Sequence, residues 1–259
     1  MSRAGAISVN RCNGAITELL LIGEIPLALA CLALAAVAVG AIAQAVTGIG
    51  FALIAGPPLI AAFGPARGIA STLVLACAAN LVPLAVERRH VQVRKALVLL
   101  IPAGLVTPLV ALALSGADDR TGAILAGAAI LIATAMLASG ARWEGATGPI
   151  STAAAGAASG AMNYIGAVGG PAVALFADNA GWPPREARAT LQAYLLGSNL
   201  ITLAALGFVL VPIDLVAALA VGAGIGVVIG RRIPDRGART ATLWIAGLGG
   251  ATLVVGGLA

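Results

Sequence analysis

Charged and aromatic residues are scarce in this chain of 259 residues. Only 10% of the residues are charged and 60% are hydrophobic, whereas a soluble domain has roughly one charged residue for every two apolar ones. A soluble globular domain is therefore excluded. Aromatic residues make up 3%, and the 15 basic residues fall into short loops, so the formal charge of +5 forms no basic stripe with interleaved aromatics. This absence argues against binding to nucleic acid.

Histidine and cysteine are too few to build a catalytic or metal site. The single histidine, His90, lies in a charged loop without a carboxylate or cysteine at ligand spacing. The three cysteines, Cys12, Cys31 and Cys77, are odd in number and far apart, with no Cys-x-x-Cys pattern. We expect no metal, no cofactor and no enzyme, because an intramembrane protease or transferase needs a nucleophile with its base or a set of metal ligands.

Long apolar runs dominate what remains. Cutting the sequence at each charged residue leaves eight uncharged stretches, 25–66, 68–86, 96–117, 121–141, 145–177, 189–213, 215–230 and 240–259. A helix that crosses a bilayer needs about 20 apolar residues, so six stretches fit one crossing each. Stretches 25–66 and 145–177 are too long for one straight helix. Each is interrupted by glycine and proline, and we expect each to form a broken or re-entrant helical hairpin.

The basic residues test these hairpins independently, because lysine and arginine in short loops gather on the cytoplasmic side. If every stretch crosses once, the two sides carry 7 and 8 basic residues, which is no bias. If the two long stretches enter and leave on the same side, the counts become 11 inside and 4 outside. We therefore expect both termini outside. Residues 1–24, which lack the short apolar region of a cleavable signal peptide, precede a first repeat (25–141) and an inverted second repeat (142–259).

A short motif recurs in the two halves. Pro65-Ala66-Arg67 followed by Thr72 matches Pro183-Pro184-Arg185 followed by Thr190, with a shared offset of 118. Inverted repeats with interrupted apolar segments are typical of secondary transporters, whose site lies near the membrane midplane. The sequence thus predicts an all-α polytopic membrane protein with two inverted repeats, each a hairpin followed by three transmembrane helices.

The two breaks are candidate binding elements for an anion. Backbone groups freed at a break must face protein or a water-filled cavity, and a half-helix that starts there aims unpaired N–H groups and a positive dipole end at the break. The candidate substrate-binding residues are Thr47, Gly48, Gly50, Thr72, Asn80, Asn163, Tyr164, Gly166, Gly169, Gly170, Thr190, Gln192, Ser198 and Asn199.

Simpler roles remain open for several of these positions. Glycines can serve only to let membrane helices approach closely, and the hydroxyls of Thr72 and Thr190 can bond back to their own helices. Arg67 and Arg185 stand at the exits of the two hairpins on opposite sides. They are candidates for guiding anions toward the pocket or, equally, ordinary interfacial anchors.

With these features the chain resembles the sulfite exporter TauE/SafE family of bacterial membrane permeases, from about Ala28 to Leu258. That family has a Gly-x-Gly-Gly-Gly run followed by proline in each half. The second half retains Gly166-Ala167-Val168-Gly169-Gly170-Pro171, whereas the first half has Gly48-Ile49-Gly50-Phe51-Ala52. The resemblance implies transport of a small anion, such as sulfite, an organosulfonate like sulfoacetate, or a carboxylate, across the bacterial cell inner membrane.

No Asp or Glu lies inside an uncharged stretch, which disfavours a proton relay through an intramembrane carboxylate. An inside-negative potential pushes an anion outward by about 2.3 kcal/mol per charge per 100 mV. We therefore expect an exporter that works by alternating access; the alternative is a passive channel for small anions or neutral solutes. The expected partners are the anion and the lipid bilayer, without nucleic acid, and the sequence is compatible with a homodimer.

Overall fold

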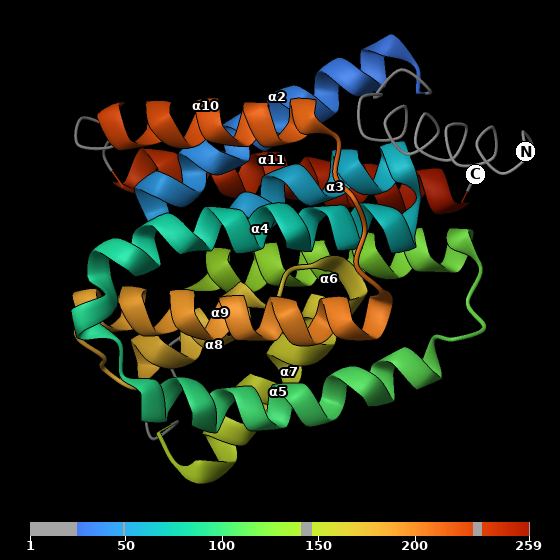
Figure 1. Cartoon of the computed structure of the whole chain (residues 1–259). Coiled ribbons are helices and arrows are strands. Elements are labelled where there is room, and N and C mark those ends of the chain that lie inside the picture. The colour runs from blue at the N-terminus through green and yellow to red at the C-terminus, as the bar shows by residue number, and fades with distance from the viewer. Residues whose placement is uncertain (1–24, 49, 141–146, 230–234, 259) are drawn as a thin grey trace, which may run out of the picture.

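The structure is a computed structural model that describes residues 25–48, 50–140, 147–229 and 235–258 (Figure 1). Within these ranges the chain is helical and contains no strand. The longer elements are α2 (Leu27–Thr47), α3 (Phe51–Phe63), α4 (Pro65–Glu87), α5 (Val93–Ala113), α6 (Asp119–Ser139), α7 (Pro149–Gly166), α8 (Gly170–Asn179), α9 (Pro184–Leu206), α10 (Ile213–Ile229) and α11 (Asp235–Leu258). The predicted all-α class is confirmed. The expected N-terminal segment, 1–24, lies outside the described residues.

Six helices of the described ranges, α2, α4, α5, α6, α9 and α11, are long and apolar enough to cross a membrane, and α3 and α10 are shorter apolar helices. Large apolar side chains lie exposed on the outside of the bundle, for example Ile101, Leu105 and Leu109 on α5. Such a surface is stable where lipid surrounds it. The chain is a multi-pass membrane protein.

Both long apolar stretches are broken, as predicted. Helix α2 ends at Thr47 and α3 starts at Phe51, and the turn between them includes Gly48 at φ 77° and Gly50 at φ 146°. Residues with a side chain rarely adopt these angles. The second break separates α7, which ends at Gly166, from α8, which starts at Gly170.

The two short helices each reach about halfway through a bilayer. Helix α3 has 13 residues and α8 has 10, which correspond to about 20 and 15 Å at 1.5 Å per residue. Their sum is close to the roughly 30 Å of a hydrocarbon core. Helices of these lengths that run from the two breaks toward opposite faces have their N-termini near the middle, so the two breaks can share one site.

Contacts between the connections fix which loops share an end of the bundle. Gln92, which precedes α5, donates its N–H to Thr190 on α9, and Lys95 pairs with Glu186. At the opposite end, Arg120 donates to the carbonyls of Gly257 and Leu258. The basic loop 87–95 and the start of α9, which we expect on the cytoplasmic side, thus lie together, and the end of α11 lies at the other end (Figure 1).

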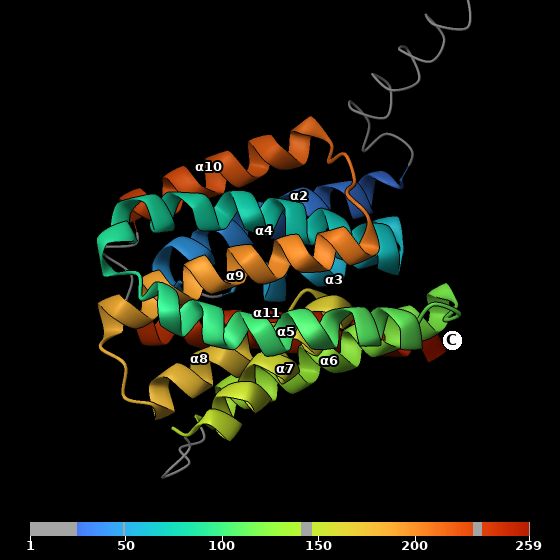
Figure 2. The ribbon, with the colours of Figure 1, turned by 60° about the horizontal axis from the view of Figure 1, so that its bottom comes forward.

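Helix contacts between the halves are reciprocal. Helix α10 lies along α2, α5 lies along α7, α4 packs on α9 and α6 packs on α11 (Figures 1 and 2). A Cβ added at Gly222 on α10 would come within 2.2 Å of the Ala38 carbonyl oxygen, and one at Gly156 on α7 within 2.3 Å of the Leu99 carbonyl oxygen. Glycine therefore permits both close approaches. A repeated unit accounts for this pattern, and the division into two repeats stays a prediction.

Candidate functional site

A small buried cavity lies between the two breaks. It measures about 40 Å³ and is bordered by the first turns of α3 and α8, by the turn before α8, and by α2, α4, α7 and α9. We call it the central cavity. It is lined by Gln44, Gly50, Phe51, Ala52, Leu53, Ala76, Asn80, Asn163, Ala167, Val168, Gly170, Pro171, Leu195 and Asn199. None of these residues is charged.

In the first half, Gln44 ties the break to the following helix. Its amide Nε2 donates to Asn80 Oδ1 on α4 at 2.9 Å, and its Oε1 accepts the N–H of Phe51, the first residue of α3, at 3.4 Å. Both side-chain amides are buried, Gln44 with 6% and Asn80 with 3% of its surface exposed. Because a buried polar group without a hydrogen-bond partner is costly, these hydrogen bonds fix the positions of the two amides.

In the second half, Asn163 occupies the corresponding role. Its Nδ2 donates to Asn199 Oδ1 and Thr202 Oγ1 on α9, both at 3.1 Å, and to Ser198 Oγ at 3.4 Å. Its Oδ1 accepts the N–H of Gly169 just before α8 at 3.4 Å. Each half thus uses one buried amide side chain to hold its break against the helix that carries its buried polar residues, α4 in the first half and α9 in the second. We call α4 and α9 the polar helices.

The two short helices direct positive potential into the central cavity. Both have an N-cap glycine, Gly50 for α3 and Gly169 for α8, so in neither helix does the N-cap residue supply a side chain that caps the first turn. The N–H groups of a first helical turn have no carbonyl in a preceding turn, and the dipole places partial positive charge there. Two such ends at one neutral cavity suit a small anion.

Several predicted site residues come together here. Gly50, Asn80, Asn163, Gly170 and Asn199 line the central cavity. Gly169 and Ser198 adjoin it through hydrogen bonds to Asn163. Thr47, Gly48 and Gln192 lie next to the first break but face a second cavity.

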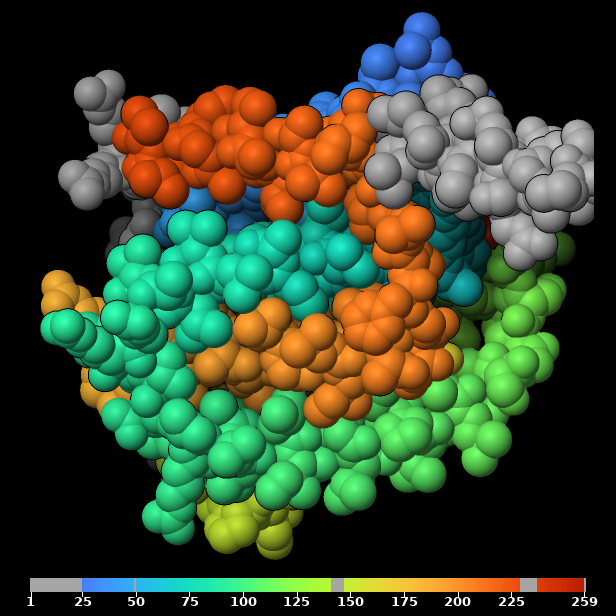
Figure 3. Space-filling model, in the orientation of Figure 1, coloured from blue at the N-terminus to red at the C-terminus, as the bar shows by residue number. Residues whose placement is uncertain are grey.

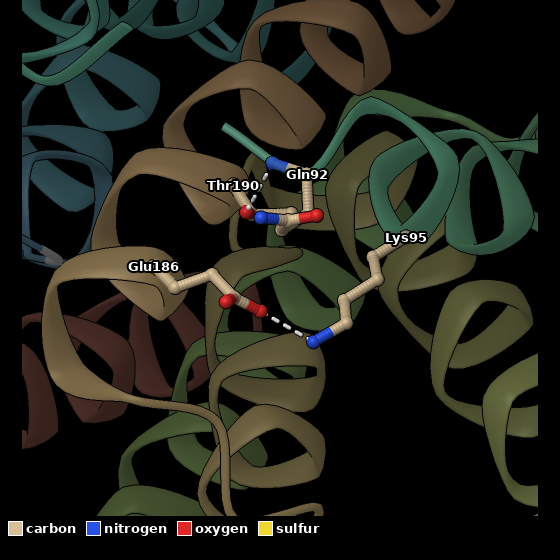
Figure 4. A network of polar contacts seen from close by, with 4 residues as sticks. All are labelled: Gln92, Lys95, Glu186 and Thr190. Atoms are coloured by element: carbon tan, nitrogen blue, oxygen red, sulfur yellow. Dashed lines mark hydrogen bonds and ion pairs between the residues drawn. The ribbon is translucent and has the colours of Figure 1, made fainter. Parts of the chain in front are cut away.

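Other predicted residues have contacts elsewhere. The hydroxyl of Thr72 donates to the Gly68 carbonyl of its own helix at 2.7 Å. Thr190 accepts the Gln92 N–H at 3.0 Å and so holds the start of α5 against α9 (Figure 4). Tyr164 and Gly166 line none of the three cavities described here.

The two arginines predicted to guide anions also lie apart from these cavities. Arg67 is exposed and stacks over the Phe63 ring at 5.6 Å, and Arg185 is exposed at the start of α9. Neither lines any of the three cavities.

The second cavity, which we call the vestibule, has a volume of about 270 Å³. It lies at the basic end of the bundle, and its charged lining residues are Arg188, Arg239 and Asp178. Gly48 and Gln192 also line it, and Gln192 Nε2 donates to the Gly48 carbonyl at 2.7 Å. Gln192 in turn accepts from Gln44 at 3.4 Å. This chain of amides stands between the vestibule and the central cavity.

A third cavity is an apolar groove of about 720 Å³ between α2, α4 and α10. Gln44 and Arg188 are among its lining residues, so it borders both other cavities. In the space-filling view, atoms of α2 (blue) are visible between α10 (red-orange) and α4 (teal) (Figure 3).

Sequence reasoning missed Gln44, Arg188 and Arg239. The signal for Gln44 was present, because it is the only amide side chain in the stretch 25–66 and lies one turn before the first break. The two arginines gave no such signal. Arg188 and Arg239 lie near the starts of α9 and α11. Which basic residue near a helix start faces a cavity depends on how the helix is rotated about its axis.

Comparison with known proteins identifies the family. No curated protein and no solved structure matches the chain. A sequence model of the family described as "Sulfite exporter TauE/SafE" matches residues 32–257, nearly the whole chain. Together with the membrane-spanning fold, this match shows that the protein belongs to the sulfite exporter TauE/SafE family of membrane transporters.

Proposed function

We propose that this protein is a secondary transporter that exports a small anion from a bacterial cell by alternating access. The substrate class is sulfite, an organosulfonate such as sulfoacetate, or a carboxylate. The observation that carries the proposal is the meeting of two half-helix N-termini, α3 and α8, at one buried neutral cavity. Because the site has no fixed positive charge, an anion held by backbone N–H groups can leave it again.

The size of the central cavity supports a carrier over the alternative, a passive channel. A volume of about 40 Å³ compares with about 30 Å³ for one water molecule in the liquid. The Gln44–Gln192–Gly48 amides also close it toward the vestibule. A conducting pore needs a continuous wide path, whereas a carrier needs only a site that opens to one side of the membrane at a time.

Flux measurements on the purified protein in proteoliposomes test the proposal. We expect saturable transport of sulfite, sulfoacetate or acetate, and we expect efflux to accelerate when the same anion is present on the far side. Unsaturated, ohmic conductance would favour the channel. Absence of flux for all three anions would contradict the proposed function.

The Asn80→Asp variant tests the site itself. An aspartate can still accept the Gln44 hydrogen bond, but its charge lies at the cavity. Two like charges about 5 Å apart repel by about 3 kcal/mol at an effective dielectric constant of about 20, so sulfoacetate flux should fall about a hundredfold. Flux should recover as the pH is lowered, because the new carboxyl is then protonated.

Thr72→Val is the matched control, since Thr72 bonds only within its own helix in the described structure and lines none of the cavities. It should transport like the wild type. An Asn80→Asp variant that transports like Thr72→Val at neutral pH would show that the central cavity is not the anion site.

A further inference from the structure

We propose that the vestibule is a second anion site, at which Arg188 and Arg239 capture the hydrated substrate before it passes the Gln192 amide into the central cavity. This inference rests on the proposed function and adds to it the site of first contact. It commits to a small organic or inorganic anion of the class that the central cavity holds.

The position of Arg188 is the first observation. Its side chain lies against the break itself: its Cγ and Nε are 3.6 and 3.7 Å from the point where a Cβ of Gly48 would stand. A larger residue at position 48 would meet this arginine. The Arg188 side chain therefore lies next to Gly48, whose carbonyl accepts the hydrogen bond from Gln192.

The charge balance is the second observation. Within the described ranges the one ion pair is Lys95 with Glu186, beside the vestibule wall, where Lys95 also lies 4.6 Å from the Trp182 ring centre. These two charges neutralise each other (Figure 4). Arg239 donates to the Leu137 carbonyl, and Asp178 is the one carboxylate of the lining. Two guanidiniums against one carboxylate leave the vestibule net positive.

Size and surroundings are the third observation. A volume of about 270 Å³ equals about nine water molecules at their liquid volume, so a small sulfonate fits there with part of its hydration shell. The hydroxyl-bearing residues Thr47 and Thr242 and the Trp182 ring complete the wall. A charged cleft of this kind concentrates its counter-ion and speeds its capture. The central cavity, which is far smaller, requires the anion to lose this water.

The test uses the full chain in proteoliposomes with sulfoacetate supplied to the vestibule face. We expect Arg188→Gln and Arg239→Gln each to raise the half-saturating concentration on that face about tenfold, as loss of one charged hydrogen bond does. The half-saturating concentration on the opposite face should stay unchanged. Arg67→Gln and Arg185→Gln are matched controls, because they remove exposed arginines that line none of the cavities.

A binding readout separates capture from a merely structural role. In a variant with Trp143 and Trp244 replaced by Phe, Trp182 reports on the vestibule, and sulfoacetate should change its fluorescence. Arg188→Gln and Arg239→Gln in this background should shift the titration to higher concentration. The inference would be overturned if the wild type transports sulfoacetate and both Arg188→Gln and Arg239→Gln behave like Arg185→Gln in flux and in fluorescence. That outcome would leave the proposed function intact. Absence of flux in the wild type would instead remove the proposed function and the inference with it.

Discussion

The first and second halves of the molecule agree in their outer contacts and differ in one inner contact. In both halves the helix that follows the polar helix lies against the hairpin of the other half: α5 on α7, and α10 on α2. Helix α5 also packs along α9, with Leu100 filling the space in front of Gly197. Helix α10 barely touches α4, and the 720 Å³ apolar groove lies between them.

If the two halves are inverted repeats, the difference between the α5–α9 and α10–α4 contacts indicates how the transporter moves. In such proteins one bundle of helices moves against another around a fixed site, and the closest contacts place α2 with α10 in one bundle and α5 with α7 in the other. The contact between α5 and α9 and the gap between α10 and α4 then describe one state, and exchanging them describes the other. We expect α10 to close onto α4 while α5 separates from α9.

The largest expected effect comes from locking the α5–α9 contact. In a chain without its native cysteines, Leu100→Cys with Gly197→Cys, joined by a short cleavable thiol cross-linker, should lose nearly all flux of the transported anion. Cleaving the linker should restore it. The physical reason is that the closed pair cannot separate.

Ala45→Cys with Gly226→Cys is the control for this lock. It joins α2 to α10, where a Cβ at Gly226 would lie 2.7 Å from the Ala45 Cβ, and these helices move together in the proposed cycle. The linked control should therefore transport normally. Normal flux from the linked α5–α9 pair would refute the proposed movement.

A smaller effect is expected where the two halves agree. Gly156→Leu and Gly222→Leu place a side chain against carbonyl oxygens in equivalent interfaces. Each should lower the stability of the protein by about 1–3 kcal/mol or more, as overpacked substitutions do. Gly224→Leu, whose added Cβ has nothing within 4 Å, is the control. Thermal unfolding in detergent measures all three, and an unaffected Gly156→Leu beside a destabilised Gly222→Leu would break the equivalence.

The smallest effect is expected at Thr190. Thr190→Val removes the hydrogen bond to the Gln92 N–H and should cost about 1 kcal/mol of stability. Since Thr190 lines none of the cavities, the half-saturating anion concentration should not change. A marked loss of affinity in flux measurements, without loss of stability, would place this residue in the site after all.

The sequence predicted the breaks because glycine and proline interrupt apolar runs too long for one helix, and both breaks occur where the runs are interrupted. It also named Asn80 and Asn199, because amides are rarely placed against lipid, and Asn163, because it lies at the second interruption. It left open whether Thr72 belongs to the site, since a threonine hydroxyl can be satisfied within its own helix, as the structure shows. It named Arg185 rather than Arg188, because the difference between them is set by the rotation of α9, which depends on tertiary contacts.

The gap beside α10 could not be predicted either. The helix α10 sequence is apolar and glycine-rich, and its glycines have different surroundings. Gly222 and Gly226 lie against α2, whereas Gly224 has open space beside it. Which contact is closed in a given state depends on small differences in free energy between whole arrangements, and local sequence does not encode that choice.

The most direct test of the central claim is protection of one cysteine at each break by the transported anion. Ala52→Cys and Val168→Cys each place a thiol in the lining of the central cavity, one at each break, and their reaction with a maleimide can be followed as sulfoacetate is added. If both helix N-termini hold one anion, sulfoacetate protects both thiols with the same half-protecting concentration. Protection of one thiol without the other, in variants that still transport sulfoacetate, would contradict a shared site.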